Sequence, residues 1–576
     1  MRQIGEPPAV PSEQAAVEEV RLFPADHLYL LGVVAAIAIG IGIRAAHLFA
    51  TNFPLNDGGL FYEMARNLQS DAFKLPETTS YNFADLPFTY PPLGLYLAAL
   101  LDKLTPFSLV DLFRLLPLLF TSLSIVAFYL LAKRILPSRV AVVAATFAFA
   151  LVPRSFIWLL MGGGVTRGLG LLMAILALHE MHRTFTTFRM RYAFSAAVFS
   201  GLTILSHLET GWFLAFSIAI FFLWFGKERH SVTSSVVVGG STLLVIAPWM
   251  LAVLSAHGTG PFFSANSSGG SVFSGGSVTE YALTSLVRVI STSEPYFPLI
   301  GMLGVVGLLS AIKHRLIALP VWWAATILLD VRAFPTFTTI PIAMLAGMAV
   351  SDVVIPMLDR GREQWPQLAL VRGSNGDTTA PHAQFVAWPG WTTVAVLAAL
   401  VLYALVGAML RKPGLGGEGE YLVSLTSGQR VAMHWVDVRT PPDSSFLVVP
   451  RSAWQVDKES EWFPVLANRP SVATVQGTEW LPDHGFDDAV SAYDRAWDCG
   501  YHTSRCLGLW AESTGKSFDY VYLTRNDRGQ CCGTLLESLE RDSDYQKVYD
   551  GPGGTVFKVV GILPKSADPQ TDDSNS

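Results

Sequence analysis

Ionisable side chains stand at the ends of apolar segments between residues 50 and 335, and their types suit chemistry on a phosphate-bearing substrate. Asp57 follows the first long apolar run, within NDGGLFYEMARNLQ, and His207 and Glu209 interrupt a later one, within SHLETGWF. A carboxylate can act as a general base toward a hydroxyl, and an arginine binds a phosphate through two parallel N–H groups. The other charged residues that suit a site of this kind are Arg154, Arg167, Glu294, Asp330 and Arg332.

Each of these side chains also has a purely structural interpretation. An Asp directly after an apolar run commonly caps the helix that follows it. Glu209 could cap a helix in the same way, with His207 bonded to a backbone group, and an arginine at a membrane boundary can extend toward lipid head groups. Ionisable residues at membrane depth are costly, however, and usually face a water-filled cavity in which they have a role. The mixture of Asp, Glu, His and Arg therefore favours a functional site.

The composition requires that much of the chain contact lipid. Of its 576 residues, 51% are hydrophobic and only 15% are charged, and its mean hydropathy is +0.39. Soluble domains carry about 25% charged residues. The net charge of −6 provides no basic face of the kind that nucleic acids require, so we expect no nucleic-acid partner.

Apolar runs of spanning length, or nearly so, predict about eleven transmembrane helices. The first run has no recognisable cleavage site, so we expect it to stay in the mature protein as a helix. The runs lie at about 28–50, 112–132, 139–153, 167–181, 192–206, 210–225, 232–254, 296–312, 316–329, 336–357 and 390–410.

The connections between these runs indicate the orientation of the chain. Every second connection is basic, and cytoplasmic loops carry the excess of Lys and Arg. We therefore predict a multi-pass protein of a plasma membrane, with a cytoplasmic N-terminal tail (1–27), a transmembrane part (28–410) and an extracytoplasmic C-terminal part. The basic residues are Lys133, Arg134, Arg139, Arg183, Arg189, Arg191, Lys227, Arg229, Lys313, Arg315, Arg360, Arg362 and Arg372.

The remaining connections then face outward and contain or flank the candidate site residues. In the largest of them, 51–111, the helical spacing of apolar residues after Asp57 predicts a helix lying on the membrane surface. Pro91 and Pro92 begin a second short amphipathic helix. The Gly- and Ser-rich stretch 255–294 is interpreted either as a mobile lid or as a disordered loop.

The C-terminal part has the patterning of a small α/β domain, 411–562, followed by a tail, 563–576, that we expect to be disordered. Helices near 420–438, 486–498 and 533–541 alternate with the strands FLVV and YVYL and the hairpin YQKVYDGPGGTVFKVV. The aromatic-rich segment EWFPVLANRPSVATVQGTEW belongs either to the core of this domain or to an acceptor-binding surface. The fold class is thus a polytopic α-helical membrane protein with a C-terminal extracytoplasmic α/β domain.

All the cysteines lie in this C-terminal part. Disulfides persist on the oxidising side of a membrane, which agrees with the predicted orientation, although buried free thiols are the alternative. The pairing among Cys499, Cys506, Cys531 and Cys532 cannot be read from the sequence.

Two motifs of the first outward loop resemble the GT-C superfamily of membrane glycosyltransferases. They are Asp57 within NDGGLFYEMA and the segment YPPLGLYL, which begins at Tyr90; HWVDVRTPPDSSFLVV is similar to the start of the extracytoplasmic domain of several members. The superfamily includes protein O-mannosyltransferases, the lipid A aminoarabinose transferase and the catalytic subunit of oligosaccharyltransferase. The resemblance covers roughly 28–350 and agrees with the predicted topology.

The resemblance implies an enzyme that transfers a sugar, with inversion, from a polyprenyl-phosphate-linked donor to a protein, lipid or glycan acceptor at the outer membrane face. Asp57 would be the catalytic carboxylate, with Glu209 as a second catalytic candidate. Asp57, Glu209 and His207 could also hold Mg²⁺ or Mn²⁺, since carboxylate and imidazole suit such ions, although no cofactor is certain. The substrate-binding candidates are Tyr90, Arg154, Arg167, Glu294, Asp330 and Arg332, with Arg332 the first choice for the lipid phosphate.

The sequence departs from the superfamily pattern at two points. Asn56 stands where many members have a second acid, and no acid occurs between Arg154 and Arg167, which disfavours the oligosaccharyltransferase branch. A transporter or flippase of a lipid-linked saccharide is a second hypothesis, although transporters tend to contain internal repeats and none is found. A non-catalytic scaffold with an outer binding domain is a third, and it leaves His207 and Glu209 without a purpose.

Overall fold

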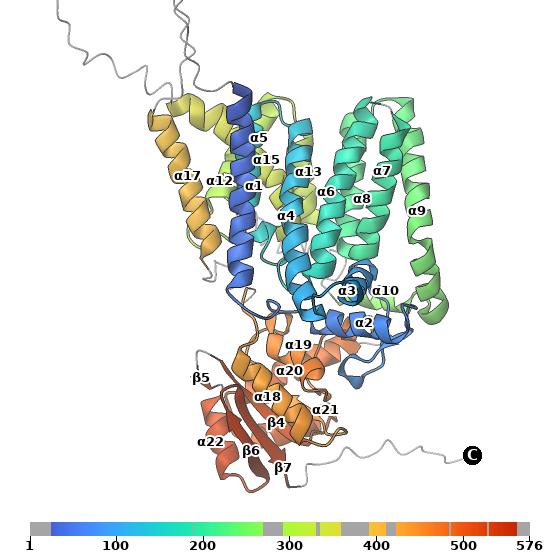
Figure 1. The fold of residues 1–576 in the computed structure, drawn as a ribbon, viewed down its shortest axis with the longest axis vertical. Coiled ribbons are helices and arrows are strands. Elements are labelled where there is room, and N and C mark those ends of the chain that lie inside the picture. The colour runs from blue at the N-terminus through green and yellow to red at the C-terminus, as the bar shows by residue number, and fades with distance from the viewer. Residues whose placement is uncertain are drawn as a thin grey trace, which may run out of the picture.

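A helical bundle forms one end of the molecule and a small sheet with its helices forms the other (Figure 1). This computed structural model describes residues 25–187, 189–268, 292–329, 334–358, 391–410, 422–482, 485–526, 529–530 and 532–561. The bundle helices are α1 (Ala25–Phe49), α4 (Leu109–Ile135), α5 (Arg139–Leu151), α6 (Gly164–Thr187), α7 (Met190–Ser206), α8 (Leu208–Phe225), α9 (Arg229–His257), α12 (Leu299–Lys313), α13 (Ala318–Leu329), α15 (Thr339–Ala349) and α17 (Trp391–Met409).

A helix occurs at each of the apolar runs that the sequence predicted as spans. Within the described residues, seven helices are long and apolar enough to cross a membrane, by length and composition. Shorter apolar helices, such as α5 and α12, lie among them. The chain is thus a largely helical membrane protein, and the number of helices that cross the bilayer stays a prediction.

The loop that contains Asp57 lies at the same end of the bundle as the sheet. From it, α2 (Gly59–Ser70) and α3 (Leu93–Leu104) run across the ends of the bundle helices (Figure 1). Leu60, Met64 and Leu68 of α2 are buried, as their spacing predicted. A two-stranded hairpin of β1 (Thr78–Thr79) and β2 (Leu86–Pro87) joins the two helices.

The opposite end of the bundle holds the connection between α4 and α5. There the guanidinium of Arg139 forms an ion pair with Asp26, in the first turn of α1. The basic residues of this connection are therefore a full helix length away from Asp57. The cytoplasmic location of that end remains the prediction from its basic residues.

The C-terminal sheet has the strand order β3-β4-β7-β6. Strand β3 (Phe446–Val448) runs parallel to β4 (Tyr520–Asn526), whereas β7 (Gly554–Val559) is antiparallel to both β4 and β6 (Tyr545–Gly551), and β5 (Gly529–Gln530) pairs with β4. Its helices are α18 (Ser427–Arg439), α19 (Lys458–Leu466), α20 (Gly485–Cys499), α21 (Arg505–Thr514) and α22 (Gly533–Arg541).

Two details of this part differ from or complete the sequence predictions. The helix predicted near 420–438 begins only at Ser427, because Thr426 and Gln429 form a capping box in which each side chain accepts the other's backbone N–H. A disulfide joins Cys499 to Cys506. Cys532 is also disulfide-bonded, while Cys531, the stretches 411–421 and 562–576 and most of the 255–294 loop lie outside the described residues. The domain boundaries stay predictions.

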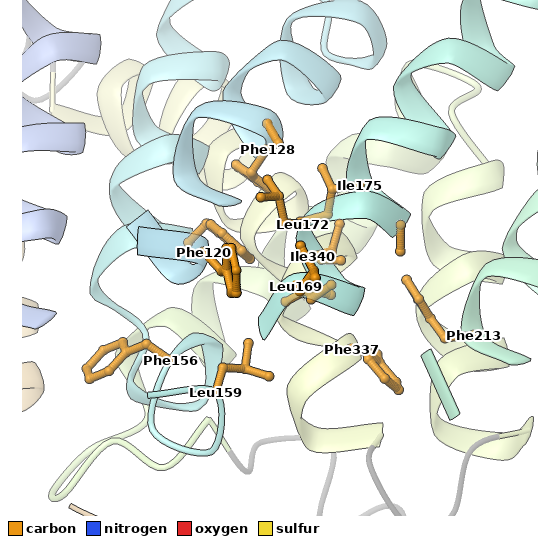
Figure 2. Close-up of a cluster of buried hydrophobic side chains, with 14 of the residues drawn as sticks. Phe120, Phe128, Phe156, Leu159, Leu169, Leu172, Ile175, Phe213, Phe337 and Ile340 are labelled. Atoms are coloured by element: carbon orange, nitrogen blue, oxygen red, sulfur yellow. The ribbon is translucent and has the colours of Figure 1, made fainter. Parts of the chain in front are cut away.

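A cluster of aromatic and aliphatic side chains fills the bundle next to the connection between α5 and α6 (Figure 2). Phe120 and Phe128 of α4 lie near Leu169 and Leu172 of α6, while Phe213 of α8 stacks on Phe337 with ring centroids 4.6 Å apart. Interiors of this kind are close-packed and resist displacement. The cluster therefore fixes the start of α6, which carries part of the candidate site.

Close packing between α12 and α15 gives a test of the bundle. A Cβ atom on Gly307 would collide with the backbone carbonyl of Leu345, whereas one on Gly239 of α9 would meet no atom within 4 Å. Gly307→Leu is expected to destabilise the fold by about 1–3 kcal/mol, because overpacking forces backbone shifts. Thermal unfolding in lipid nanodiscs, followed by tryptophan fluorescence, measures this loss, with Gly239→Leu as the matched control. Equal melting temperatures for the two variants would contradict the packing.

Candidate functional site

The loop that carries Asp57 is held from two sides by backbone hydrogen bonds. On the bundle side, the N–H of Gly162 donates to the carbonyl of Leu55 at 2.8 Å. On the C-terminal side, the N–H of Asn56 donates to the carbonyl of Val423 at 2.9 Å. Asn56 and Gly58 both have positive φ angles, 48° and 124°, which Asn and Gly adopt more readily than other residues. The loop therefore has a defined conformation that its residue types permit.

The carboxylate of Asp57 is buried at the N-terminus of α6. Its Oδ1 accepts the backbone N–H of Gly163 at 2.8 Å, and its Oδ2 pairs with Nη2 of Arg167 at 2.7 Å. Asp57 is only 8% exposed and Arg167 only 7%. A buried carboxylate needs such partners because isolated charge is costly away from water, and a helix N-terminus favours negative charge. Asp57 is thus an oriented carboxylate, and the sequence interpretation as a simple helix cap is wrong: α2 has no side-chain cap.

Arg167 contacts more than Asp57. Its guanidinium lies over the ring of Trp158 at 4.7 Å, and its Nη2 also donates to the Trp158 carbonyl at 3.2 Å. The buried Nε has no hydrogen-bond partner among the described residues. A buried donor of this kind calls for an explanation such as a bound ligand or water. The position of Arg167 next to Asp57 therefore suits both positioning of the carboxylate and contact with a substrate oxygen.

Tyr90 is a half-buried side chain that contacts the start of α6. Its hydroxyl is 3.1 Å from Oγ1 of Thr166. Burial raises the pKa of Tyr90 to about 12; Thr166 and Arg167 oppose this shift, whereas the charges of Glu209 and Asp57 add to it. Tyr90 therefore stays a neutral hydrogen-bond donor at physiological pH. The charges of Asp57, Arg167 and Glu209, which are far apart in sequence, thus all act on the Tyr90 hydroxyl.

His207 is part of the same cluster but has a structural role as well. Its ring lies 6.3 Å from that of Tyr90 and 5.8 Å from that of Trp158, measured between centroids. Its Nδ1 accepts the backbone N–H of Thr210 at 3.3 Å and is 2.9 Å from the Thr210 hydroxyl, so His207 is the N-cap of α8. The sequence assigned that cap to Glu209, which instead lies half-buried in the first turn.

Two of the remaining predicted residues, Arg154 and Glu294, have contacts with the segment that precedes α12. Arg154 is buried in the short turn Pro153–Ser155, where its backbone N–H donates to the backbone carbonyl of Thr292. Glu294 accepts the hydroxyl of Thr292 at 2.6 Å and the N–H of Ile300 near 3.1 Å, and so caps α12. The substrate-binding role that the sequence predicted for Glu294 therefore gains no support from these contacts. Asp330 and Arg332 lie outside the described residues.

The metal ligands proposed from the sequence do not form a cluster. Among the described residues, no group of three His, Cys, Asp or Glu side chains could hold a metal ion. Asp57 is bonded to a guanidinium and a backbone N–H, and Nδ1 of His207 faces Thr210. In this arrangement, these side chains do not fit a divalent cation.

Sequence reasoning missed the contribution of α19. Glu461, only 5% exposed, accepts the N–H of Gly58 at 2.8 Å through its Oε1, and Nε1 of the fully buried Trp462 donates to the carbonyl of Asn56 at 2.8 Å. The only signal in the sequence was KESEWF, a charged run followed directly by aromatic residues. No pattern in it indicates a contact with the Asp57 loop, about 400 residues earlier in the chain. Trp462 thus belongs to the core, as one of the two sequence interpretations had it, whereas Trp480 lies half-buried with its ring 6.1 Å from that of Tyr90.

The charge state of Glu461 gives a prediction about stability. Burial, and next the charge of Asp57, raise the pKa of Glu461 from 4.5 to about 8, although the N–H of Gly58 and Arg167 oppose the shift. Because the folded state holds this proton more tightly than the unfolded state, the contribution of Glu461 to stability is fully present below pH 4.5 and is lost as pH rises through 8. From pH 6 to pH 8, the melting temperature of the native protein should fall more than that of Glu461→Gln. Parallel profiles would contradict the assignment.

Comparison with known proteins agrees with this architecture. The family model for dolichyl-phosphate-mannose-protein mannosyltransferase matches residues 89–252, a range that includes Tyr90, Arg154, Arg167, His207 and Glu209 but not the Asp57 loop. A sequence search of curated proteins gave no significant match.

Solved structures of glycosyltransferases are similar in fold. The archaeal oligosaccharyltransferase AglB from Archaeoglobus fulgidus, in complex with an inhibitory peptide and a dolichol-phosphate, is 16% identical with a TM-score of 0.53, over 86% of this chain and 69% of that one. Arabinofuranosyltransferase AftD from Mycobacteria is 16% identical with a TM-score of 0.54, over 92% of this chain and 40% of that one. ArnT from Cupriavidus metallidurans in the apo state is 15% identical with a TM-score of 0.50, over 92% and 98%. The predicted GT-C resemblance is confirmed.

Proposed function

We propose that this chain, a membrane glycosyltransferase with the GT-C fold, transfers a sugar from a polyprenyl-phosphate-linked donor to an acceptor hydroxyl at the outer membrane face. The matching family is described by its dolichyl-phosphate-mannose donor, and the AglB complex contains a dolichol-phosphate. The observation that carries the proposal is the buried Asp57 carboxylate, which Arg167 and Gly163 orient and whose charge acts on the Tyr90 hydroxyl.

The proposed reaction is a single displacement with inversion at the anomeric carbon. Asp57 accepts the proton of the acceptor hydroxyl as its oxygen forms the new bond to the anomeric carbon. The bond from that carbon to the phosphate oxygen breaks on the opposite face, and its electron pair leaves with the lipid phosphate. General-base catalysis of this kind contributes about 10²–10⁴-fold.

The neighbours of Asp57 have distinct roles in this proposal. Arg167 fixes the carboxylate, and its buried Nε has no hydrogen-bond partner among the described residues. Neutral Tyr90 donates a hydrogen bond to an oxygen of the substrate. Glu209 is a second carboxylate, and its charge acts on the Tyr90 hydroxyl. The half-buried Trp480 provides an aromatic edge near the site, where an acceptor sugar or lipid could pack.

The competing hypotheses lack an observation of comparable weight. A transporter would place its polar residues near the middle of the bundle, whereas Asp57, Gly163 and His207 lie at helix ends. A scaffold has no need for a buried carboxylate paired with an arginine. Transfer therefore accounts for more of the side-chain arrangement than either alternative.

Substitution of the proposed base tests the function directly. Asp57→Asn should lower transfer by at least about 10²-fold, because an amide cannot accept the proton. Loss of sugar from radiolabelled polyprenyl-phosphate mannose and arabinose, with membrane extract as the source of acceptor, measures the rate. Asp71→Asn, at an exposed position at the end of α2, is the matched control and should retain full activity. Full transfer by Asp57→Asn would rule out the assigned role.

A chelator tests the proposal of a divalent cation. We expect transfer to continue in EDTA, since Arg167 and Thr210 already contact the groups on Asp57 and His207 that would bind the ion. The measurement is the same assay in EDTA, followed by addition of Mg²⁺ or Mn²⁺. Activity that disappears and returns with either ion would establish a metal site that these contacts do not indicate.

A further inference from the structure

Glu461 is an acid in the C-terminal part of the chain that bonds to the loop of the proposed base. Its Oε1 accepts the N–H of Gly58, the residue that follows Asp57, at 2.8 Å. A second backbone N–H, that of Leu60, also faces the carboxylate. Both N–H groups lie at the start of α2, where no preceding carbonyl of that helix can accept them. Glu461 therefore takes the place of the missing side-chain cap of α2.

The helix that carries Glu461 is fixed against the same loop by further contacts. The Tyr81 hydroxyl donates to the Glu461 carbonyl at 2.7 Å, and Nε1 of Trp462 donates to the carbonyl of Asn56. Nδ2 of Asn56 donates to the carbonyl of Val456 at 3.2 Å. Gly59 lies so close to the Glu461 carbonyl that a Cβ atom there would collide with it. The backbone from Asn56 to Gly59 thus has little freedom to move while α19 is in place.

We propose that Glu461 is a positioning residue of the catalytic centre, which holds the Gly58 peptide and thereby aims the Asp57 carboxylate at the acceptor hydroxyl. This inference rests on the proposed role of Asp57 as the base. It places a part of the reaction machinery in the C-terminal part of the chain, about 400 residues from the base.

Two substitutions of nearly equal size test the hydrogen bond. In Glu461→Met the side chain cannot accept the Gly58 N–H, so the loop loses its restraint, and kcat should fall by about 10²-fold, as expected for a displacement of about 1 Å. Glu461→Gln retains a carbonyl oxygen at that position and should recover most of the lost kcat. The donor KM should change less than about threefold in both variants, because Glu461 contacts the loop and not the donor.

A control separates positioning from general stability. The buried Trp510 of α21 donates through its Nε1 to the backbone carbonyl of Ala492 of α20 at 2.7 Å. Trp510→Phe should lower the melting temperature as much as Glu461→Met or more, yet leave kcat unchanged. If kcat falls in Trp510→Phe in proportion to its loss of stability, or if Glu461→Met keeps full kcat, the positioning role is wrong.

Hydrogen exchange of the segment 55–60 provides a readout that does not depend on turnover. The Gly58 amide should exchange slowly in the native protein and in Glu461→Gln, and much faster in Glu461→Met. Unchanged protection in Glu461→Met would overturn the inference even if transfer is observed. Conversely, if no polyprenyl-phosphate sugar is consumed while the exchange pattern follows this order, the proposed function fails but the contact of Glu461 with the loop is established.

Discussion

A negatively charged side chain that is buried at the boundary between a helical bundle and the C-terminal part of the chain must find partners there, and Asp57 is in this position. A buried carboxylate without partners is costly, so its loop has to lie where donors already exist. Those donors are the N–H of Gly163 and the guanidinium of Arg167, both at the start of α6. The structure around the site holds these groups in place relative to one another.

The bundle side of this arrangement depends on packing. The start of α6 rests on the aromatic and aliphatic cluster between α4, α6, α8 and α15 (Figure 2), and Arg167 lies over the ring of Trp158. The C-terminal side depends on hydrogen bonds, since Glu461 and Trp462 bond to the backbone on either side of Asp57. The positive φ angles of Asn56 and Gly58 show that the loop holds an uncommon conformation. Such conformations persist where the surroundings over-determine them, as they do here.

The two sides have different chemical consequences. The bundle provides charge, through Arg167, and a neutral hydroxyl, through Tyr90, on which the charges of Asp57 and Glu209 act. The C-terminal part provides Glu461, whose pKa is raised to about 8 by burial and by the charge of Asp57. In the proposed mechanism, the two parts must be in contact before Asp57 is aimed, so the interface between them would belong to the active centre.

The sequence by itself determined the membrane class, the positions of the helices and the GT-C resemblance, because hydrophobic runs of fixed length and short motifs are local properties. It also identified Asp57, Arg167, His207 and Glu209 as candidates, since ionisable residues next to apolar runs are conspicuous, and Tyr90 through the motif that resembles the GT-C superfamily. Only the tertiary structure decided that Arg167 pairs with Asp57, that His207 rather than Glu209 caps α8, and that Glu294 caps α12. It alone revealed Glu461, because a hydrogen bond between residues about 400 positions apart leaves no periodic trace in the sequence. Which charged groups share a buried site depends on how helices pack, and packing is a property of the whole chain.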